Sequence, residues 1–506
     1  MSKRILSVLL AALMLISMLS LFSCKKNNQE GANSTEGTTS ADELVVDDNV
    51  DPTVRFDVPA ELDYGGQEFA ILTWENTNEF GNDTLPDKTI VNQAVLTRDN
   101  FLEQYLGVTL KVIYKDGQWA QSVEFAEHAY KSIFAQNGDY DLICAYSMVP
   151  SILTPQSALL DISSGDFGSK GTNYLDFDKR WWPEFMKERL TVNEKTYSMS
   201  GDASITLLYN LSVVMMDYAE LRANQLDPKT IYNAVDSGDW TLEYWLDLCK
   251  DLSRDNGDSV WDQNDYYAIT GVGRVPYSSF YFSTGNGLVD NKNGRLVISD
   301  DITSERAINV YDMVYTAMHT DHSVRNSDTG EMMLIGNGNA IFEMGTTGTL
   351  GSVIETSNRD VGMVPFPKYD KNDSSYITLV QNTHSHFCIP SDAKDPSLSS
   401  AVLETLGYSS YDVVSPVVYE NVMKLRYSKD PDSSRMFDII RDGAMTDAGI
   451  LNYWVFVGNN CPDPLSMFRN LLHDSPSGGD WLSNFENRYK SGMEKTLNDL
   501  NVFYLG

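Results

Sequence analysis

The chain has 506 residues, a formal net charge of −33 and a hydrophobic fraction of 42%. This length exceeds what one simple core holds and predicts two or more domains. The strongly negative charge disfavours binding to nucleic acid or to another polyanion, so the composition favours a neutral or cationic ligand.

The first segment of the chain is typical of an export signal. Residues 1–4 include two basic side chains, and an apolar run follows from Ile5 to Phe22. The run ends at Ser23-Cys24, and a small residue before a cysteine resembles the bacterial lipobox. We therefore expect residues 1–23 to be removed and lipids to anchor Cys24 at the extracellular face of the cell membrane. An ordinary secretory signal with an incidental cysteine is the alternative.

Residues 24–56 are predicted to form a flexible tether behind this anchor. Asn, Gln, Gly, Ser, Thr and acidic residues dominate the stretch. Such a composition buries too little apolar surface to offset the entropy lost on ordering. The folded part is therefore expected to begin near residue 57.

The folded part opens with three predicted strands separated by two predicted helices. The strands are expected at residues 67–73, 108–113 and 140–146, and the helices at 91–106 and 125–134. This order is typical of a parallel sheet covered by helices. The middle of the chain is richer in helix, with Thr241 as the cap of one helix and another helix at 304–318. Strand character returns at 360–366 and 385–390.

The ends of the first and third strands predict one binding site, because ligands of parallel sheets bind outside the carboxyl ends of the strands. Trp74, Glu75 and Asn76 follow the first strand, and Tyr146 and Ser147 follow the third.

Several other conspicuous side chains are interpreted as buried structural residues. The tryptophans in this group are Trp181, Trp182, Trp240 and Trp245. Four cysteines besides Cys24 have no CxxC spacing, and we assign no disulfide to them; they are Cys144, Cys249, Cys388 and Cys461.

One acidic segment has the spacing of a calcium-binding loop. Asn256, Asp258, Asp262 and Asp265 match positions 3, 5, 9 and 12 of such a loop. Position 1, however, is Arg254, where the ion needs an oxygen ligand. The segment predicts a degenerate site, with structural calcium as the candidate cofactor.

Five motifs then follow one another along the chain. They are EKTYSMSGDASITLLYNLSV from Glu194, DSGDWTLEYWLDLCKDL from Asp236, GNAIF from Gly338, VGMVPFP from Val361, and Ile389-Pro390-Ser391. In this order they resemble the family-1 extracellular solute-binding proteins of bacterial ABC sugar importers.

The resemblance implies an α/β fold of the periplasmic-binding-protein type (type II), with two lobes joined by two or three crossings and a ligand cleft between them. One lobe would contain residues 57–205 and 366–412, and the other residues 206–365 and 413–506. It further implies a monomer without catalytic activity that captures a carbohydrate, most simply an oligosaccharide, and delivers it to ABC transporter permease subunits in the membrane.

Matching the family's motifs to this chain adds binding residues from both expected lobes. Besides Tyr146, they are Asp202, Ser204, Tyr281, Phe282, Thr346 and Trp454. Aromatic faces would cover the apolar face of a sugar ring, and the polar groups would bond its hydroxyls. Asp202 is equally compatible with a loop cap, because Gly-Asp loops commonly bond their own backbone.

The sequence is also compatible with two other classes of function. A secreted glycoside hydrolase needs two carboxylates about 5–10 Å apart across a cleft. The sequence has neither a GxSxG nor an HExxH motif, and His384 and His386 lie too close to the last predicted strand to form an obvious metal set. A carbohydrate-binding surface adhesin is the other alternative.

Overall fold

The computed structural model describes residues 51–506, apart from residues 76, 82–88, 164, 272–274, 327–334, 428–430 and 475–480. The described residues belong to one compact unit, Asp51–Gly506. The expected signal peptide, Cys24, most of the tether and Asn76 lie outside the described residues. Within them, no helix combines the length and the apolar character needed to cross a membrane.

A four-stranded sheet, here the first sheet, contains the three strands predicted at the start of the folded part. Its strands are β1 (Gln67–Trp74), β2 (Val108–Lys115), β3 (Leu142–Tyr146) and β11 (Ser385–Cys388), in the order β11-β3-β1-β2. β1 is parallel to both β2 and β3, as predicted, whereas β11 is antiparallel to β3. A strand from much later in the chain therefore completes this sheet.

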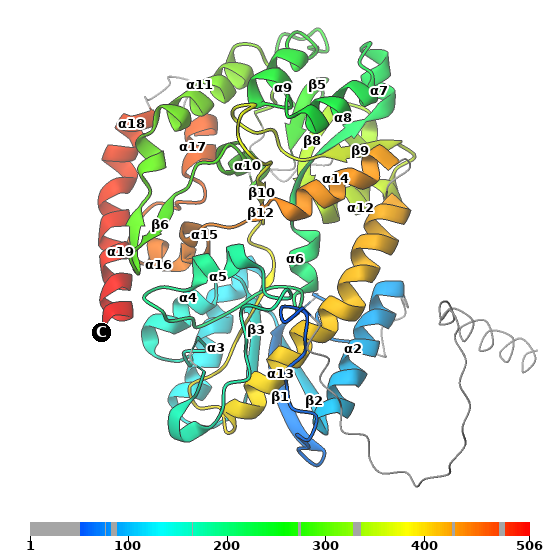
Figure 1. Ribbon diagram of the computed structural model, residues 1–506. Helices are drawn as coiled ribbons and strands as arrows, with labels where there is room; N and C mark the ends of the chain where they lie inside the picture. The colour runs from blue at the N-terminus through cyan, green and yellow to red at the C-terminus, as the bar shows by residue number, and fades with distance from the viewer. Residues whose placement is uncertain are drawn as a thin grey trace, which may run out of the picture. The chain divides into compact units, whose positions relative to one another are not determined.

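Helices surround the first sheet (Figure 1). They are α2 (Ile90–Leu106), α3 (Ser122–Phe134) and α13 (Pro396–Ser409). Thr89 begins α2 by accepting a hydrogen bond from the backbone N–H of Asn92 at 3.2 Å. Gly107 ends it with a φ of 62°, which L side chains rarely adopt, so the chain reverses directly into β2.

A second four-stranded sheet, at the top of Figure 1, has the order β5-β8-β4-β9. Its strands are β4 (Ser212–Asp217), β5 (Tyr267–Gly271), β8 (Ala340–Thr346) and β9 (Val361–Val364). β5 and β8 are parallel, and β4 runs antiparallel between β8 and β9. The helices around it include α8 (Pro228–Ser237), α9 (Leu242–Cys249), α10 (Ser278–Ser283), α11 (Glu305–His319) and α12 (Thr347–Thr356).

The predicted start of α9 and its buried tryptophans are confirmed. The Thr241 hydroxyl accepts from the backbone N–H of Tyr244 at 3.2 Å. Trp240 and Trp245 are fully buried, and the Trp245 ring lies 5.7 Å from the ring of Phe342 in β8. These two tryptophans attach α9 to the second sheet.

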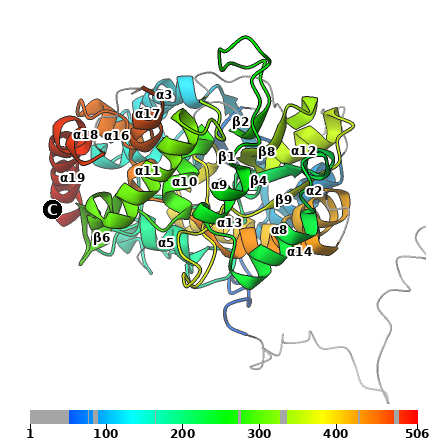
Figure 2. The same cartoon turned by 90° about the horizontal axis from the view of Figure 1, so that it is seen from above.

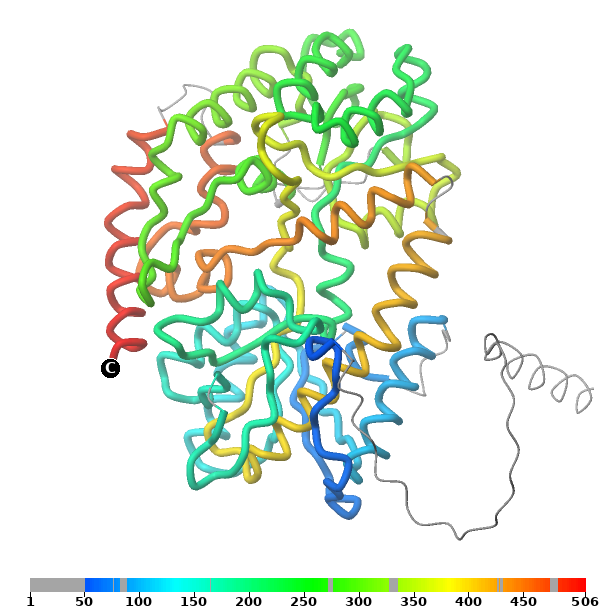
Figure 3. The backbone as a smooth tube through the Cα atoms, viewed as in Figure 1, coloured from blue at the N-terminus to red at the C-terminus, as the bar shows by residue number. Residues whose placement is uncertain are grey.

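Three connections link the two sheets, and Figure 3 follows them as a tube. The first contains α6 (Ile205–Tyr209), the second is residues 365–384, and the third contains the π-helical segments Ser410–Val414 and Val417–Tyr427 before α14 (Pro431–Asp442). The first two lie side by side, since the N–H of Gln381 donates to the carbonyl of Asn210 at 2.8 Å.

The last helices of the chain gather on one side of the molecule (Figure 2). They are α16 (Tyr453–Gly458), α17 (Met467–Asp474), α18 (Trp481–Asn484) and the longer α19 (Lys490–Leu505), and α15 (Ala448–Leu451) precedes them. α19 packs on β7 (Arg295–Ile298), the partner of β6 (Val289–Lys292), while α16 contacts both α19 and α4 (Pro150–Leu153). Because α4 follows directly after β3, α16 lies close to the carboxyl edge of the first sheet.

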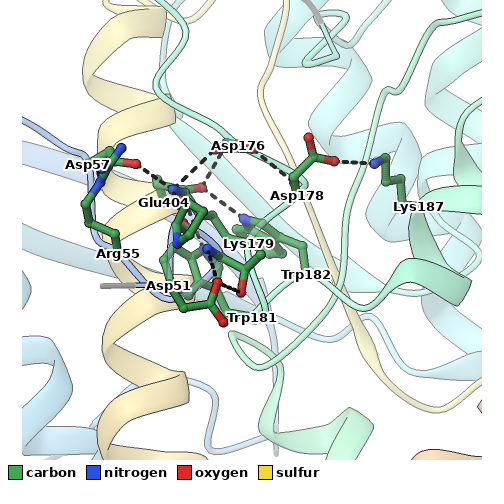
Figure 4. Close-up of polar contacts among 12 residues, drawn as sticks. Asp51, Arg55, Asp57, Asp176, Asp178, Lys179, Trp181, Trp182, Lys187 and Glu404 are labelled. Atoms are coloured by element: carbon green, nitrogen blue, oxygen red, sulfur yellow. Dashed lines mark hydrogen bonds and ion pairs between the residues drawn. The ribbon is translucent and has the colours of Figure 1, made fainter. Parts of the chain in front are cut away.

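A buried carboxylate anchors the two tryptophans that were expected to be structural. Figure 4 shows the indoles of Trp181 and Trp182 beside Glu404 of α13. Their Nε1 atoms donate to the Glu404 carboxylate at 3.1 and 2.9 Å. Burial raises the pKa of Glu404 to about 8. Nearby, Lys179 is almost fully buried and its Nζ lies 2.5 Å from a carboxylate oxygen of Asp57.

All four described cysteines are buried and unbridged; they are Cys144, Cys249, Cys388 and Cys461.

Candidate functional site

Five aromatic side chains, here the aromatic cluster, meet at the carboxyl edge of the first sheet. They are Trp74, Trp119, Tyr146, Tyr453 and Trp454. The rings of Trp74 and Tyr146 lie edge to face with centroids 5.1 Å apart. The Trp119 ring lies 4.7 Å from that of Tyr453 and 5.3 Å from that of Trp454. Trp119 and Tyr146 are 6.4 Å apart, which joins the two groups.

The secondary structure explains why these rings meet. Trp74 is the last residue of β1 and Tyr146 the last of β3, so parallel strands place both at one sheet edge. Trp119 follows β2 in a short 3-10 helix, Trp119–Gln121. Tyr453 and Trp454 begin α16. The cluster thus combines three strand ends with one helix from the end of the chain.

Local contacts hold the inner part of the cluster in place. The Trp74 indole Nε1 donates to Ser385 Oγ of β11 at 2.8 Å. A Cβ atom at Gly117 would lie 2.6 Å from the Phe125 ring and 3.0 Å from Trp74 Cβ, so a glycine is needed for this turn to approach β1. Trp74 and Tyr146 are buried, whereas Trp119 is 39% exposed. Burial raises the pKa of Tyr146 to about 12.

One ion pair lies near the α16 side of the cluster. Asp463 and Arg469 are 3.2 Å apart, and burial raises the pKa of Asp463 to about 6. Burial and the Asp463 charge raise the pKa of Tyr453 to about 12. The cluster is therefore uncharged and largely buried, with one carboxylate and one guanidinium close to one side.

Ser147 directly follows β3 and Tyr146 of the cluster. Its Oγ donates to the carbonyl of Asn382 at 2.6 Å. Ser147 also lines a cavity of about 30 Å³ together with Leu451, Asn452 and Tyr504. The end of β3 therefore meets α15 and α19 around a small cavity.

Asp202 and Ser204 lie in the first connection, with partners outside the cluster. The Ser415 hydroxyl donates to the buried Asp202 carboxylate, and Arg441 lies 4.0 Å from it. Burial raises the pKa of Asp202 to about 6. Asp202 and Arg441 line a cavity of about 200 Å³, so Asp202 links the first connection to the third. Ser204 caps α6 by accepting from the N–H of Leu207 at 3.2 Å.

The structure places Tyr281, Phe282 and Thr346 apart from the cluster. Tyr281 and Phe282 are buried in α10, where the Tyr281 ring lies 5.5 Å from that of Phe468 and 5.7 Å from that of Trp481. Thr346 ends β8 and caps α12. Glu75 is exposed.

The acidic loop bonds to its own backbone. The Asp265 carboxylate accepts from the N–H groups of Asn256 and Asp262 at 2.9 and 2.6 Å. Asp258 accepts from the N–H of Val260 at 2.8 Å. Over the described parts of the chain, no three or more His, Cys, Asp or Glu side chains are grouped to hold a metal ion. The carboxylates of Asp258 and Asp265 therefore accept hydrogen bonds from within the loop.

Trp119 and Tyr453 complete the cluster but were absent from the predicted site. The rule that selected Trp74 and Tyr146 applies equally to Trp119, which lies four residues after the end of β2. Tyr453 precedes the predicted Trp454 directly. Extending the strand-end rule to all three parallel strands would have found Trp119.

Comparisons with solved structures identify the fold. A substrate-binding protein of an ABC transporter from Listeria monocytogenes, in complex with cycloalternan, aligns with a TM-score of 0.52 and 11% identity over 86% of this chain and 98% of that chain. UgpB from Mycobacterium tuberculosis, in complex with glycerophosphocholine, gives a TM-score of 0.52 and 13% identity over 86% of this chain and 99% of its own.

A third structure, an ABC transporter solute-binding protein from Thermotoga lettingae bound with α-D-tagatose, gives a TM-score of 0.50 and 12% identity over 86% of this chain and 100% of that chain. No protein-family model and no curated protein matches the sequence. At these identities the similarity is one of fold, and it agrees with the resemblance drawn from the five motifs. The chain has the α/β periplasmic-binding-protein fold of the solute-binding proteins of ABC transporters.

Proposed function

We propose that this protein is the extracellular solute-binding subunit of an ABC importer, that it captures a carbohydrate, and that it catalyses no reaction. The aromatic cluster is the observation that carries the proposal. Its five rings come from the ends of β1 and β3, from the 3-10 helix after β2 and from α16, and flat rings suit the apolar faces of sugars. The structures with the same fold include proteins bound to α-D-tagatose and to cycloalternan.

The cluster lies where two proposed lobes would meet. One lobe comprises residues 57–205 and 366–412, the other residues 206–365 and 413–506, and the three connections form the hinge. Trp119 belongs to the first lobe, and Tyr453 and Trp454 belong to the second. The ring centroids of Trp119 and Tyr453 are 4.7 Å apart, whereas a sugar held between two rings needs about 7–8 Å, twice a contact distance of about 3.5–4.0 Å. A sugar therefore enters when the lobes separate.

The ligand class follows from the surface that the cluster offers. Uncharged rings dominate it, and the net charge of −33 opposes a polyanionic ligand. We propose a neutral oligosaccharide, since several rings along one cleft can cover more than one sugar unit.

Trp119→Ala tests the proposed site. Trp119 is partly exposed, so its removal should leave the melting temperature of the ligand-free protein nearly unchanged. Loss of a stacking face should weaken saccharide binding by about 1–3 kcal/mol, or roughly five- to a hundredfold. The measurements are melting curves and calorimetric titrations with maltose, maltotetraose, cycloalternan and cello-oligosaccharides. Trp119 is a cleaner test than Tyr146, because removing the buried Tyr146 also opens a cavity.

Trp261→Ala is the matched control. Trp261 is a half-buried tryptophan whose ring stacks on His322, with centroids 4.6 Å apart. It should leave saccharide binding unchanged. Wild-type affinity in the Trp119 variant would remove the cluster from the binding site. Turnover of a bound saccharide at about 1 per second or faster would instead favour a glycoside hydrolase.

We also propose that the protein is a lipoprotein anchored through Cys24. The apolar run that ends at Ser23-Cys24 supports this assignment. In cells fed a labelled fatty acid, the wild-type protein should take up the label and Cys24→Ala should take up none. Equal labelling of the two proteins would contradict the assignment, and a Cys461→Ala variant controls for loss of a cysteine elsewhere.

A further inference from the structure

The indole N–H of Trp454 has no acceptor. Trp454 Nε1 is buried and without a hydrogen-bond partner in the described structure, although the side chain as a whole is half-buried. The rings of Tyr453 and Trp119 pack against it, with centroids 4.8 and 5.3 Å away. By contrast, the N–H of Trp74 in the same cluster bonds to Ser385 Oγ.

A buried donor without an acceptor raises the free energy of the conformation that buries it. The Trp119 ring, which belongs to the other proposed lobe, packs 5.3 Å from the Trp454 ring, so separating the lobes removes this cover and gives water access to the Trp454 side of the cluster. The missing hydrogen bond therefore raises the free energy of the closed, ligand-free arrangement. It does not raise the free energy of the open arrangement. A ligand oxygen that accepts a hydrogen bond from the Trp454 N–H removes this free-energy cost while the lobes stay closed.

We infer that the Trp454 N–H donates a hydrogen bond to an acceptor oxygen of the ligand and thereby makes closure depend on that oxygen. The inference rests on the proposed function and adds a specificity rule to it. A hydroxyl, ring or carbonyl oxygen satisfies the donor, and an analogue that lacks oxygen at this point does not. Trp454 is thus a specificity-determining residue as well as an aromatic wall.

Trp245 shows what sets Trp454 apart. Its Nε1 is also buried without a partner, but the ring is fully buried among Trp240, Phe280 and Phe342. All four residues lie on the side of the second sheet, so lobe separation leaves the Trp245 environment unchanged. Of these two tryptophans, Trp454 is therefore the one whose missing acceptor responds to closure.

The first test needs no ligand. Dyes on cysteines introduced at Phe134 and Val260, two exposed positions on different proposed lobes, report the closed fraction by single-molecule energy transfer in the Cys24→Ala protein. We expect the ligand-free protein to be mainly open. Trp454→Phe, which removes the donor, should raise the ratio of closed to open molecules about tenfold. Replacing Trp454 by 3-benzothienylalanine, which keeps the bicyclic ring and lacks the N–H, should do the same if the phenylalanine variant folds poorly.

Trp119→Phe and Trp245→Phe are the controls, and neither should raise the closed fraction. The inference is overturned if the ligand-free protein is already closed, or if both replacements of Trp454 leave the ratio unchanged. The second test titrates maltotetraose. Trp454→Phe should weaken its binding about tenfold, or about 1.4 kcal/mol, and Trp119→Phe by less than threefold. Failure of the wild-type protein to bind any saccharide would count against the proposed ligand class, while the closed fraction would still decide the role of Trp454.

Discussion

Glu404 has a strongly shifted acid–base equilibrium. Its usual pKa of 4.5 rises to about 8 because burial disfavours its charged form, although two indole N–H groups favour that form. The folded state therefore binds this proton more tightly than the unfolded state. The stability that Glu404 contributes is fully present below about pH 4 and is lost as the pH rises toward 8.

Glu404→Gln should remove this contribution to the pH dependence. Between pH 5 and pH 8, the free energy of unfolding of the variant should fall less steeply than that of the wild type. The measurement is denaturant unfolding at several pH values. Glu494→Gln, at an exposed position, is the control and should keep the wild-type slope. An identical slope in the Glu404 variant would show that its carboxylate is already ionised at pH 5.

Individual site residues differed in how far the sequence could predict them. Trp74, Tyr146 and Ser147 were predictable because a strand end fixes a position at the sheet edge. The surroundings of Tyr281 were not, because Phe468 and Trp481 reach it from helices nearly 200 residues later in the chain. Which side chains of a short helix such as α10 become buried depends on its contacts with these later helices.

At the scale of elements, α6 is held by a carboxylate from another part of the chain. Glu79, in the loop after β1, is buried, and it accepts from the backbone N–H groups of Ile205 and Thr206 at 2.7 and 3.2 Å. The Ser204 and Thr206 hydroxyls donate to it as well. Glu79 therefore fixes the start of the first connection to the edge of the first sheet.

Glu79→Gln should destabilise the protein by about 1–3 kcal/mol, because the amide turns a donor toward groups that are already donors. Denaturant unfolding measures the change, and Glu75→Gln at the nearby exposed position should have almost no effect. A neutral or stabilising result for Glu79→Gln would show that the cost of burying the charge exceeds the gain from its hydrogen bonds.

Most strands of the first sheet and most helices around it could be predicted, because the spacing of apolar residues within each segment indicates its structure. The partner of β3 could not. β11 pairs with β3, and Ser385 bonds to Trp74 across 311 residues of sequence. Only tertiary packing decides which strand occupies such an edge.

At the scale of the whole molecule, the ordered motifs predicted the fold, because their order reflects the order of strands and connections. They predicted less about the end of the chain. α16 contacts α4 beside the first sheet, while α19 packs on β7 on the side of the second sheet. Side-chain periodicity carries no information about such distant partners.

The contact of Trp119 with Tyr453 and Trp454 has a consequence for rates. In the molecules whose rings are in contact, a sugar cannot lie between the rings until they part, and parting does not depend on the sugar concentration. Open molecules therefore bind at a rate that rises with sugar concentration, and the closed molecules bind in a second phase at the constant rate of ring separation. The rate of that second phase is determined by the packing of the protein rather than by diffusion.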